Sequence, residues 1–250
     1  MFDQSTIADG VTRWTGLGIK LPKELAAAID VFEAIQYTEV GYAPVLNIEE
    51  VTAANADAKI RELADQLLLA PQPGAGLSVL ERAKKQVLEA AARRLNNLAR
   101  HYFPAAVEQL APEFTRHAEA YVAAVAKLPE DISSDTLIAA GADAVAAFGV
   151  AQQEANYLDR ISGWVADSGY LFGVLPKDIE VVLRVLRPES GIELAKLDEA
   201  HQLPANQALH AIGPVFYTAA RSGVQFGINS AREAAQLRKR LELRRTSSSA

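Results

Sequence analysis

Apolar residues recur at every third or fourth position along most of the chain, the spacing that places side chains on one face of an α-helix. The longest such stretches run almost back to back from Asn47 to Asp167, and residue types that start or stop helices flank them. The pattern predicts an all-α fold: an elongated bundle of long antiparallel helices, then shorter helices and a basic C-terminal helix.

Residues 1–46 are expected to form an irregular segment and one helix. Glycines interrupt the periodicity before Leu21, and Pro22 suits the first turn of a helix over Lys23–Thr38. Asn47 is the expected N-cap of the next helix. The apolar face of that helix is marked by Ile48, Val51, Ile60, Leu63, Leu67 and Ala70.

The clearest break follows at residues 71–76, where Pro-Gln-Pro-Gly-Ala-Gly predicts a turn or short linker. Ser78-x-x-Glu81 then has the form of a capping box, in which each side chain accepts a hydrogen bond from the other residue's N–H. The helix that it opens is expected to reach Phe103. Pro104 is expected to bend or end that helix.

Helical periodicity resumes over Ala105–Leu128, with a restart at Pro112 as an alternative. Ser134 is the expected N-cap of the longest helix, which runs to about Asp167. Apolar residues along this helix have a mean spacing near 3.4, close to the heptad repeat of helices that pack along their length. The sequence therefore predicts a bundle of long helices over residues 47–167.

Residues 168–231 are expected to form shorter helices that pack on the bundle. Glycines and aromatic residues over Ser168–Leu175 predict a packed turn. Short helices are expected over Pro176–Leu186 and Glu189–His201, separated by Pro188. With residues 232–250 as a basic helix and tail, the four segments are expected to form one domain.

The segment 214–231 has two interpretations. Val215–Tyr217 and Val224–Phe226 have the composition of two strands of a hairpin. A helix is preferred because small residues recur at every fourth position and would form a smooth ridge, which allows a neighbouring backbone to approach closely. The residues of this predicted helix-packing ridge are Ala219, Gly223, Gly227, Ala231 and Ala235.

Composition agrees with helices rather than sheets, because only 7% of residues are aromatic and the core must be built mainly from Ala, Leu, Val and Ile. The chain has no cysteine. The absence of cysteine excludes disulfides, thiolate metal sites and cysteine nucleophiles. No signal peptide and no apolar stretch of membrane-spanning length is visible, so a cytoplasmic location is expected, with a virion as the alternative.

Charge is distributed unevenly over a chain whose net charge is −6. Residues 232–250 contain six basic and two acidic residues. Five cations within eight residues exceed what the C-terminal end of a helix needs to balance its dipole, so this helix is the predicted partner-binding element. The cations are Arg238, Lys239, Arg240, Arg244 and Arg245.

Residues 77–104 are the other basic segment, again with six basic and two acidic residues. One face of this helix places four cations in a row that is suited to contact with nucleic-acid phosphates. The four are Arg82, Lys85, Arg93 and Arg100. Glu89 interrupts the row, no aromatic side chains are interleaved for base stacking, and the acidic balance of the chain opposes non-specific binding.

Catalytic motifs are not visible in the sequence. Glu113 and His117 lie four residues apart on one helix face, but a single pair does not make a metal site, so no metal or cofactor is expected. Aromatic residues near breaks in the helices offer the one candidate pocket. They are Trp164, Tyr170 and Phe172, with Phe216 and Tyr217 as further candidates.

These observations favour a non-enzymatic structural or assembly protein, a helical subunit that self-associates or scaffolds other proteins. An acidic helical body that ends in a basic helix is similar in layout to viral scaffolding proteins, a compositional similarity that many helical proteins share. The first alternative is a nucleic-acid-associated protein that uses residues 77–103 and 232–245. The second is a helical enzyme or ligand binder with the aromatic pocket.

Overall fold

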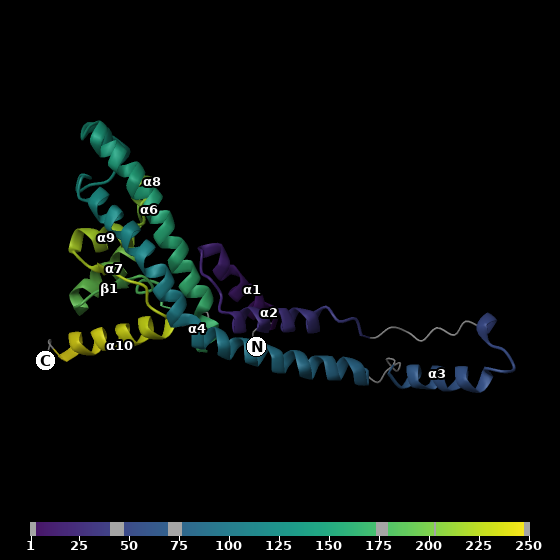
Figure 1. Cartoon of the computed structure of the whole chain (residues 1–250). Helices are drawn as coiled ribbons and strands as arrows, with labels where there is room; N and C mark the ends of the chain where they lie inside the picture. Colours follow the sequence, from purple (N-terminus) through teal and green to yellow (C-terminus); the bar gives the residue numbers. More distant parts are fainter. Residues whose placement is uncertain (1–3, 41–47, 70–76, 174–179, 203, 248–250) are drawn as a thin grey trace. The chain divides into compact units, whose positions relative to one another are not determined.

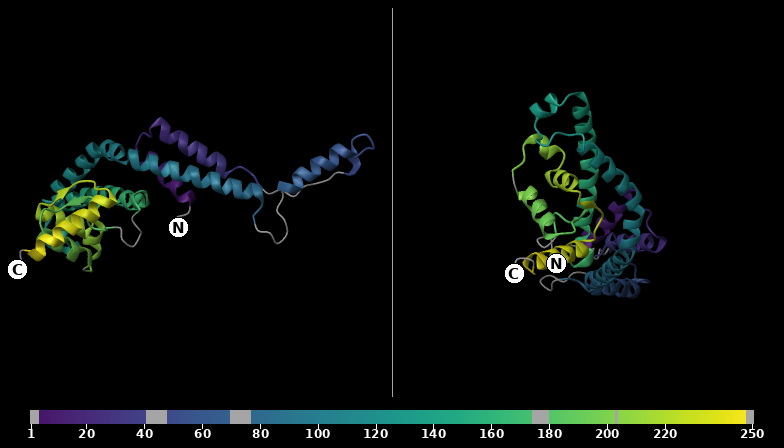
Figure 2. Two further views of the ribbon diagram at one scale, coloured as in Figure 1. Left: turned by 90° about the horizontal axis from the view of Figure 1, so that it is seen from below. Right: turned by 90° about the vertical axis from the view of Figure 1, so that its left-hand side faces the viewer.

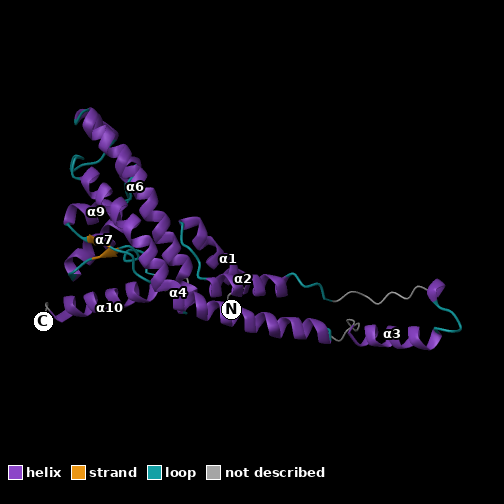
Figure 3. Cartoon of the chain, viewed as in Figure 1, coloured by secondary structure: helices purple, strands orange, loops and turns teal. Residues whose placement is uncertain are grey.

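The computed structural model describes residues 4–40, 48–69, 77–173, 180–202 and 204–247 (Figure 1). Helices dominate this part of the chain, and β1 (Leu186–Arg187) and β2 (Gln225–Phe226) are its two short strands (Figure 3). The predicted all-α class is therefore confirmed. The chain divides into two compact units, residues 1–16 with 20–101 and residues 17–19 with 102–250.

The first unit begins with helix where an irregular segment was predicted. α1 (Gln4–Thr12) and the 3₁₀ turn η1 (Arg13–Leu17) precede α2 (Lys23–Gln36). Ala8, Val11 and Trp14 follow one another at intervals of three residues and are all buried. Their burial offsets the cost of about 1 kcal/mol that a helical glycine carries at Gly10. The helix predicted over Lys23–Thr38 is confirmed, with an end two residues earlier.

α2 runs antiparallel to the start of α4 (Val79–Val125). The ammonium group of Lys84, near the start of α4, donates to the carbonyl oxygens of Gln36 and Thr38, each at 2.7 Å. A cation at this place compensates the unpaired carbonyls at the end of α2. The core of this unit includes the fully buried side chains of Leu25, Phe32, Leu95 and Ala99.

The Ser78–Glu81 capping box is confirmed at the start of α4. The Ser78 N–H donates to Glu81 Oε2 at 2.7 Å, and the Glu81 N–H donates to Ser78 Oγ at 3.1 Å. The preceding helix is shorter than predicted: a 3₁₀ turn, η2 (Ile48–Glu50), is followed by α3 (Ala56–Leu69). The predicted cap Asn47 lies outside the described residues. Asn55 instead closes a turn, accepting from the Thr52 N–H at 2.6 Å.

α4 continues through both prolines that were expected to end or restart it. Pro104 and Pro112 lie on its exposed side, where water can hydrate the carbonyl groups that lose their helical partners. The predicted helices 78–103 and 105–128 are therefore one element. The boundary between the two units falls within this helix, between His101 and Tyr102.

The helix predicted from Ser134 to Asp167 is interrupted after its first turns. α5 (Ser134–Ala139) is followed by Gly141, and α6 (Ala142–Asp167) begins there. Gly141 has φ +93°, a conformation that side-chain-bearing residues rarely adopt, so the chain changes direction at this position. The N-cap of α5 is Ser133, not Ser134: its hydroxyl accepts from the Thr136 N–H at 3.2 Å.

Neighbouring serines here allow a matched test of the cap. Replacing Ser133 with alanine is expected to cost about 1 kcal/mol, because the Thr136 N–H loses its acceptor. In a domain of this size that loss lowers the Tm by about 2–4 °C. The Ser134→Ala variant should keep the parent Tm. Thermal unfolding followed by circular dichroism measures both, and equal shifts in the two variants would contradict the observed cap.

In the second unit, α6 runs antiparallel to the second half of α4 (Figures 1 and 2). Phe103 stacks on Trp164 with ring centroids 4.9 Å apart, whereas His117, later in α4, bonds Glu154, earlier in α6. This reversed order of contacts defines the antiparallel pairing. The antiparallel arrangement predicted for the long helices is thus seen in this pair.

The rest of the second unit contains short elements. η3 (Ser168–Phe172) follows α6, and α7 (Gly191–Gln202), α8 (Gln207–Ala211) and α9 (Pro214–Ser222) come before β2. The helix predicted over Pro176–Leu186 is wrong for its described part, since residues 180–185 are not helical and Leu186 is in β1. The helix predicted over Glu189–His201 is confirmed as α7.

Residues 214–231 form neither a continuous helix nor a local hairpin. α9 ends at Gly223, which has φ +71°, and the Val224 N–H closes the end by donating to the Ala219 carbonyl at 2.9 Å. β2 then pairs antiparallel with β1, with Phe226 opposite Leu186. The predicted ridge is therefore not on one helix. Its residues are divided between α9 and its cap (Ala219, Gly223), the position after β2 (Gly227) and α10 (Ala231, Ala235).

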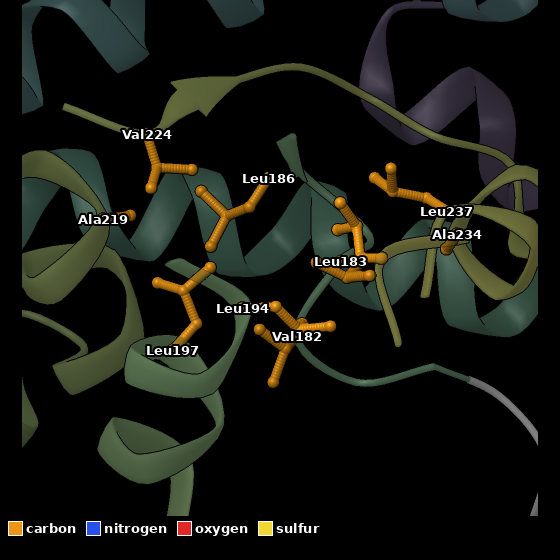
Figure 4. Packing of buried hydrophobic residues seen from close by; sticks show 10 residues of the cluster. Val182, Leu183, Leu186, Leu194, Leu197, Ala219, Val224, Ala234 and Leu237 are labelled. Atoms are coloured by element: carbon orange, nitrogen blue, oxygen red, sulfur yellow. The ribbon is translucent and has the colours of Figure 1, made fainter. Parts of the chain in front are cut away.

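α10 (Ala231–Ser247) confirms the predicted basic C-terminal helix. Its buried face closes a hydrophobic cluster with α7, α9 and the segment around β1 (Figure 4). Leu183, Leu186 and Leu197 are fully buried in this cluster. The cluster fixes residues 182–186 against α10, and this arrangement positions the polar groups described below.

Candidate functional site

α3 presents an apolar face that its own unit covers only in part: Ile60 and Leu67 are exposed, and Ala56 and Leu63 are half-buried. Of the α3 side chains that the structure describes, which end at Leu67, none is buried. Ile60 is 67% exposed and Leu67 is 53% exposed. Ala56, Ile60, Leu63 and Leu67 follow one another at intervals of four, three and four residues, as in the contact line of a coiled coil. We call these four residues the α3 seam.

Ion pairs within the helix flank the α3 seam. Arg61 lies 3.1 Å from Asp57, and Lys59 lies 3.1 Å from Glu62. Such exposed pairs contribute little to stability, but they leave both edges of the seam with charges of both signs. The start of α4 adds exposed apolar residues, with Val79 at 54% and Val87 at 51% exposure.

The predicted phosphate-contacting face is exposed on the first half of α4. All four residues are exposed: Arg82, Lys85, Arg93 and Arg100. Contact with phosphates requires exposed cations, but exposure alone does not show such contact. The phosphate-contacting role of these four residues therefore stays a prediction. Lys84, between the first two, is held by the end of α2 instead.

The structure corrects the role predicted for Arg238 in α10. Its guanidinium forms ion pairs with Glu180 and, at 2.7 Å, with Asp198 of α7. Hydrogen bonds to Asp198 and Glu180 raise the pKa of Arg238 above its ordinary value. Only 26% of the Arg238 side chain is exposed, and only 10% of Glu180. Arg238 therefore connects three parts of the unit, and its guanidinium is occupied by carboxylates of the same chain.

The other predicted partner-binding cations lie further around α10. Lys239, Arg240 and Arg244 are exposed, and the side chain of Arg245 lies outside the described part. Arg240 and Arg244 line an open groove of about 850 Å³, together with Glu189 and other residues. The groove combines charges of both signs, so contact with a partner through these cations stays a prediction.

Of the aromatic residues predicted to line a pocket, Trp164 and Phe172 pack against Phe103, whereas Phe216 lines a cavity of the second unit that is described below. Phe103 stacks on Trp164 at 4.9 Å with 9° between the rings, and the edge of Phe172 meets Phe103 at 5.1 Å. The side chain of Tyr170 lies outside the described part. Tyr217 donates through its hydroxyl to the carbonyl oxygens of Pro129 and Glu130, at 3.1 and 2.9 Å. These contacts position loops and fill space.

Glu113 and His117 share a helix face as their spacing predicts, and His117 Nε2 lies 3.5 Å from Glu113. The sequence did not reveal the nearer partner, Glu154 of α6, whose carboxylate bonds His117 Nδ1. Glu154 is buried, and the His117 ring stacks on Tyr157 at 3.8 Å. Burial, with the nearby Glu113 charge, raises the pKa of the Tyr157 hydroxyl. The bond from His117 to Glu154 and the stacking of His117 on Tyr157 stabilise the contact between α4 and α6.

Within the described ranges, no three or more histidine, aspartate and glutamate side chains are arranged to hold a metal ion. None of the helices described combines the length and apolar character needed to cross a membrane. No protein family, curated protein or solved structure matches the chain.

Proposed function

We propose that the protein is a non-enzymatic assembly subunit that self-associates through the α3 seam. The observation that carries the proposal is the exposure of Ile60 and Leu67 on a helix with no buried side chain in its described part. Helices of this length are marginally stable alone, and most of their stability in proteins comes from burying an apolar face. A partner that covers the seam would supply that burial.

A second copy of the same chain is the occupant that the seam fits best. The four–three–four spacing is that of a contact line between two helices, and an identical helix presents the same line. The charges beside it are paired within the helix, Asp57 with Arg61 and Lys59 with Glu62, so two copies meet without a strong field of one sign. Two heptads give a small contact, and the association is expected to depend on concentration.

Light scattering tests this proposal on the full chain. The measured molar mass of the parent protein is expected to rise above the monomer value of 26.9 kDa as the protein concentration increases. The Ile60→Glu variant should stay at the monomer mass over the same range, because a charge in the contact line would be desolvated without a partner. Ala58→Glu, on the opposite face of α3, is the matched control and should associate like the parent.

Two results would contradict the proposal. A parent chain that stays monomeric throughout the range would exclude self-association. An Ile60→Glu chain that associates as strongly as Ala58→Glu would place any self-association outside the α3 seam. Circular dichroism of each variant shows whether its helical content is retained.

A further inference from the structure

The second unit contains a cavity of about 500 Å³ whose lining shares no residue with the α3 seam. It lies between α6, the segment 181–184, the end of α7 and the turn from α8 to α9. Its lining includes the polar groups of Asn156, Asp159, Arg184, His201 and His210 and the ring of Phe216. The volume is within the range of small-molecule sites, which combine apolar walls with a few polar groups.

The apolar wall is formed before any ligand arrives. Phe216 packs against Tyr121 and Phe226, and its ring centroid lies 6.3 Å from the ring centroid of each. The adjacent Gly213 has φ +75°, and a Cβ at this position would lie 2.8 Å from a ring carbon of Phe216. The Tyr121 hydroxyl donates to the Ile212 carbonyl at 2.7 Å and fixes the same turn. A fixed wall reduces the ordering cost of binding.

Arg184 supplies a cation to the cavity. Its Nε donates to the Glu180 carbonyl at 2.6 Å, and its own carbonyl accepts from the Asn229 N–H at 2.9 Å. Within the described part of the chain, neither terminal nitrogen of Arg184 donates a hydrogen bond to another residue. Burial lowers the pKa of Arg184, although the charges of Glu180 and Asp159 act in the opposite direction. A guanidinium with one edge fixed and its terminal N–H groups available is suited to a planar two-oxygen anion.

The charge balance of the lining selects among anions. Arg184 and Asp159 together are neutral, so every negative charge on a ligand is also repelled by Asp159, and a dianion such as a phosphate monoester is repelled more strongly than a monoanion. His201, His210 and Asn156 add hydrogen-bonding groups around the cation. A single negative charge on a molecule with an apolar body matches the lining best.

We propose that this cavity binds a small organic monocarboxylate, with its carboxylate on Arg184 and its apolar body against Phe216 and Val215. The proposal does not depend on self-association, because the lining comes entirely from the second unit. Asn229 and Glu180 hold Arg184 in place and act as positioning residues.

Calorimetric titration of the full chain with 1-naphthoate tests the proposal, with neutral 1-naphthamide and 1-naphthyl phosphate as comparison probes. Naphthoate should bind more tightly than either. Arg184→Gln should weaken naphthoate binding at least tenfold, since hydrogen bonds to a charged group are lost. The matched control is Arg232→Gln, an exposed arginine of α10 outside the cavity, which should leave the affinity unchanged.

A second variant fills the cavity without removing a polar group. Ala211→Phe places a ring among the lining residues and should abolish naphthoate binding while Arg184 is retained. If Arg184→Gln lowers the Tm, its weaker binding is not specific to the lost guanidinium, and the affinity of Ala211→Phe then decides whether naphthoate binds in this cavity. The proposal is overturned if none of the probes binds, if the amide or the phosphate binds as tightly as naphthoate, or if Ala211→Phe keeps the parent affinity.

Discussion

Replacing Arg238 with methionine is expected to lower the free energy of unfolding of the second unit by about 2–4 kcal/mol. The Glu180 side chain is only 10% exposed and would keep its charge without its partner. Asp198 would lose its ion pair in the same variant. Because the arginine itself is partly exposed, the expected loss lies towards the lower end of the range for buried pairs.

Urea unfolding followed by circular dichroism measures this effect. The matched control is Lys239→Met, one residue further along α10 on an exposed position, which should change stability by no more than about 0.5 kcal/mol. Arg238→Lys should be intermediate, because an ammonium group keeps the charge but cannot reach both carboxylates with a planar fork. Equal stability of the Arg238→Met and Lys239→Met variants would show that Arg238 does not connect these elements.

Replacing Asn229 with alanine is the second change expected to have a large effect, a loss of about 2–4 kcal/mol. The Asn229 amide nitrogen donates to the carbonyls of Leu183, at 2.6 Å, and Leu186, at 3.1 Å. Its amide oxygen accepts from Arg187 Nε at 2.9 Å. Asn229 is buried, so alanine would leave two carbonyl groups without a donor in a place that water reaches poorly.

Gln236→Ala is the matched control for Asn229, since Gln236 carries the same amide group on an exposed position of α10. It should leave the urea midpoint unchanged. Hydrogen exchange adds a local readout, because the Gly227 N–H that donates to the Val185 carbonyl at 3.0 Å should lose protection in Asn229→Ala. Retention of that protection, with an unchanged midpoint, would contradict the anchoring role of Asn229.

Elements with local signals could be predicted from the sequence. The helix over Lys23–Gln36, the Ser78–Glu81 capping box and the basic helix α10 each depend on residues within a few positions of one another. The errors arose where one residue can act in two ways. Pro104 continues a helix because it lies on the exposed side, and Gly141 stops one because it adopts positive φ.

Contacts between distant segments decided the rest. Val224–Phe226 was not predicted to pair with residues near Leu186, because a strand of two residues carries almost no periodicity of its own. Arg238 resembled any other exposed cation of a basic helix until its partners, Glu180 and Asp198, were known from the fold. The cavity around Arg184 likewise combines residues from α6 to α9, and no local motif indicates it.

Cysteine cross-linking tests the central claim of self-association through α3 most directly, because the chain contains no cysteine of its own. In a Leu63→Cys variant the new thiol lies in the α3 seam, where paired helices bring equivalent side chains within disulfide distance. Under mild oxidation this variant is expected to form a covalent dimer. Ala58→Cys, on the opposite face of α3, should remain largely monomeric. Equal dimer yields from the two positions, or none from Leu63→Cys, would contradict the account.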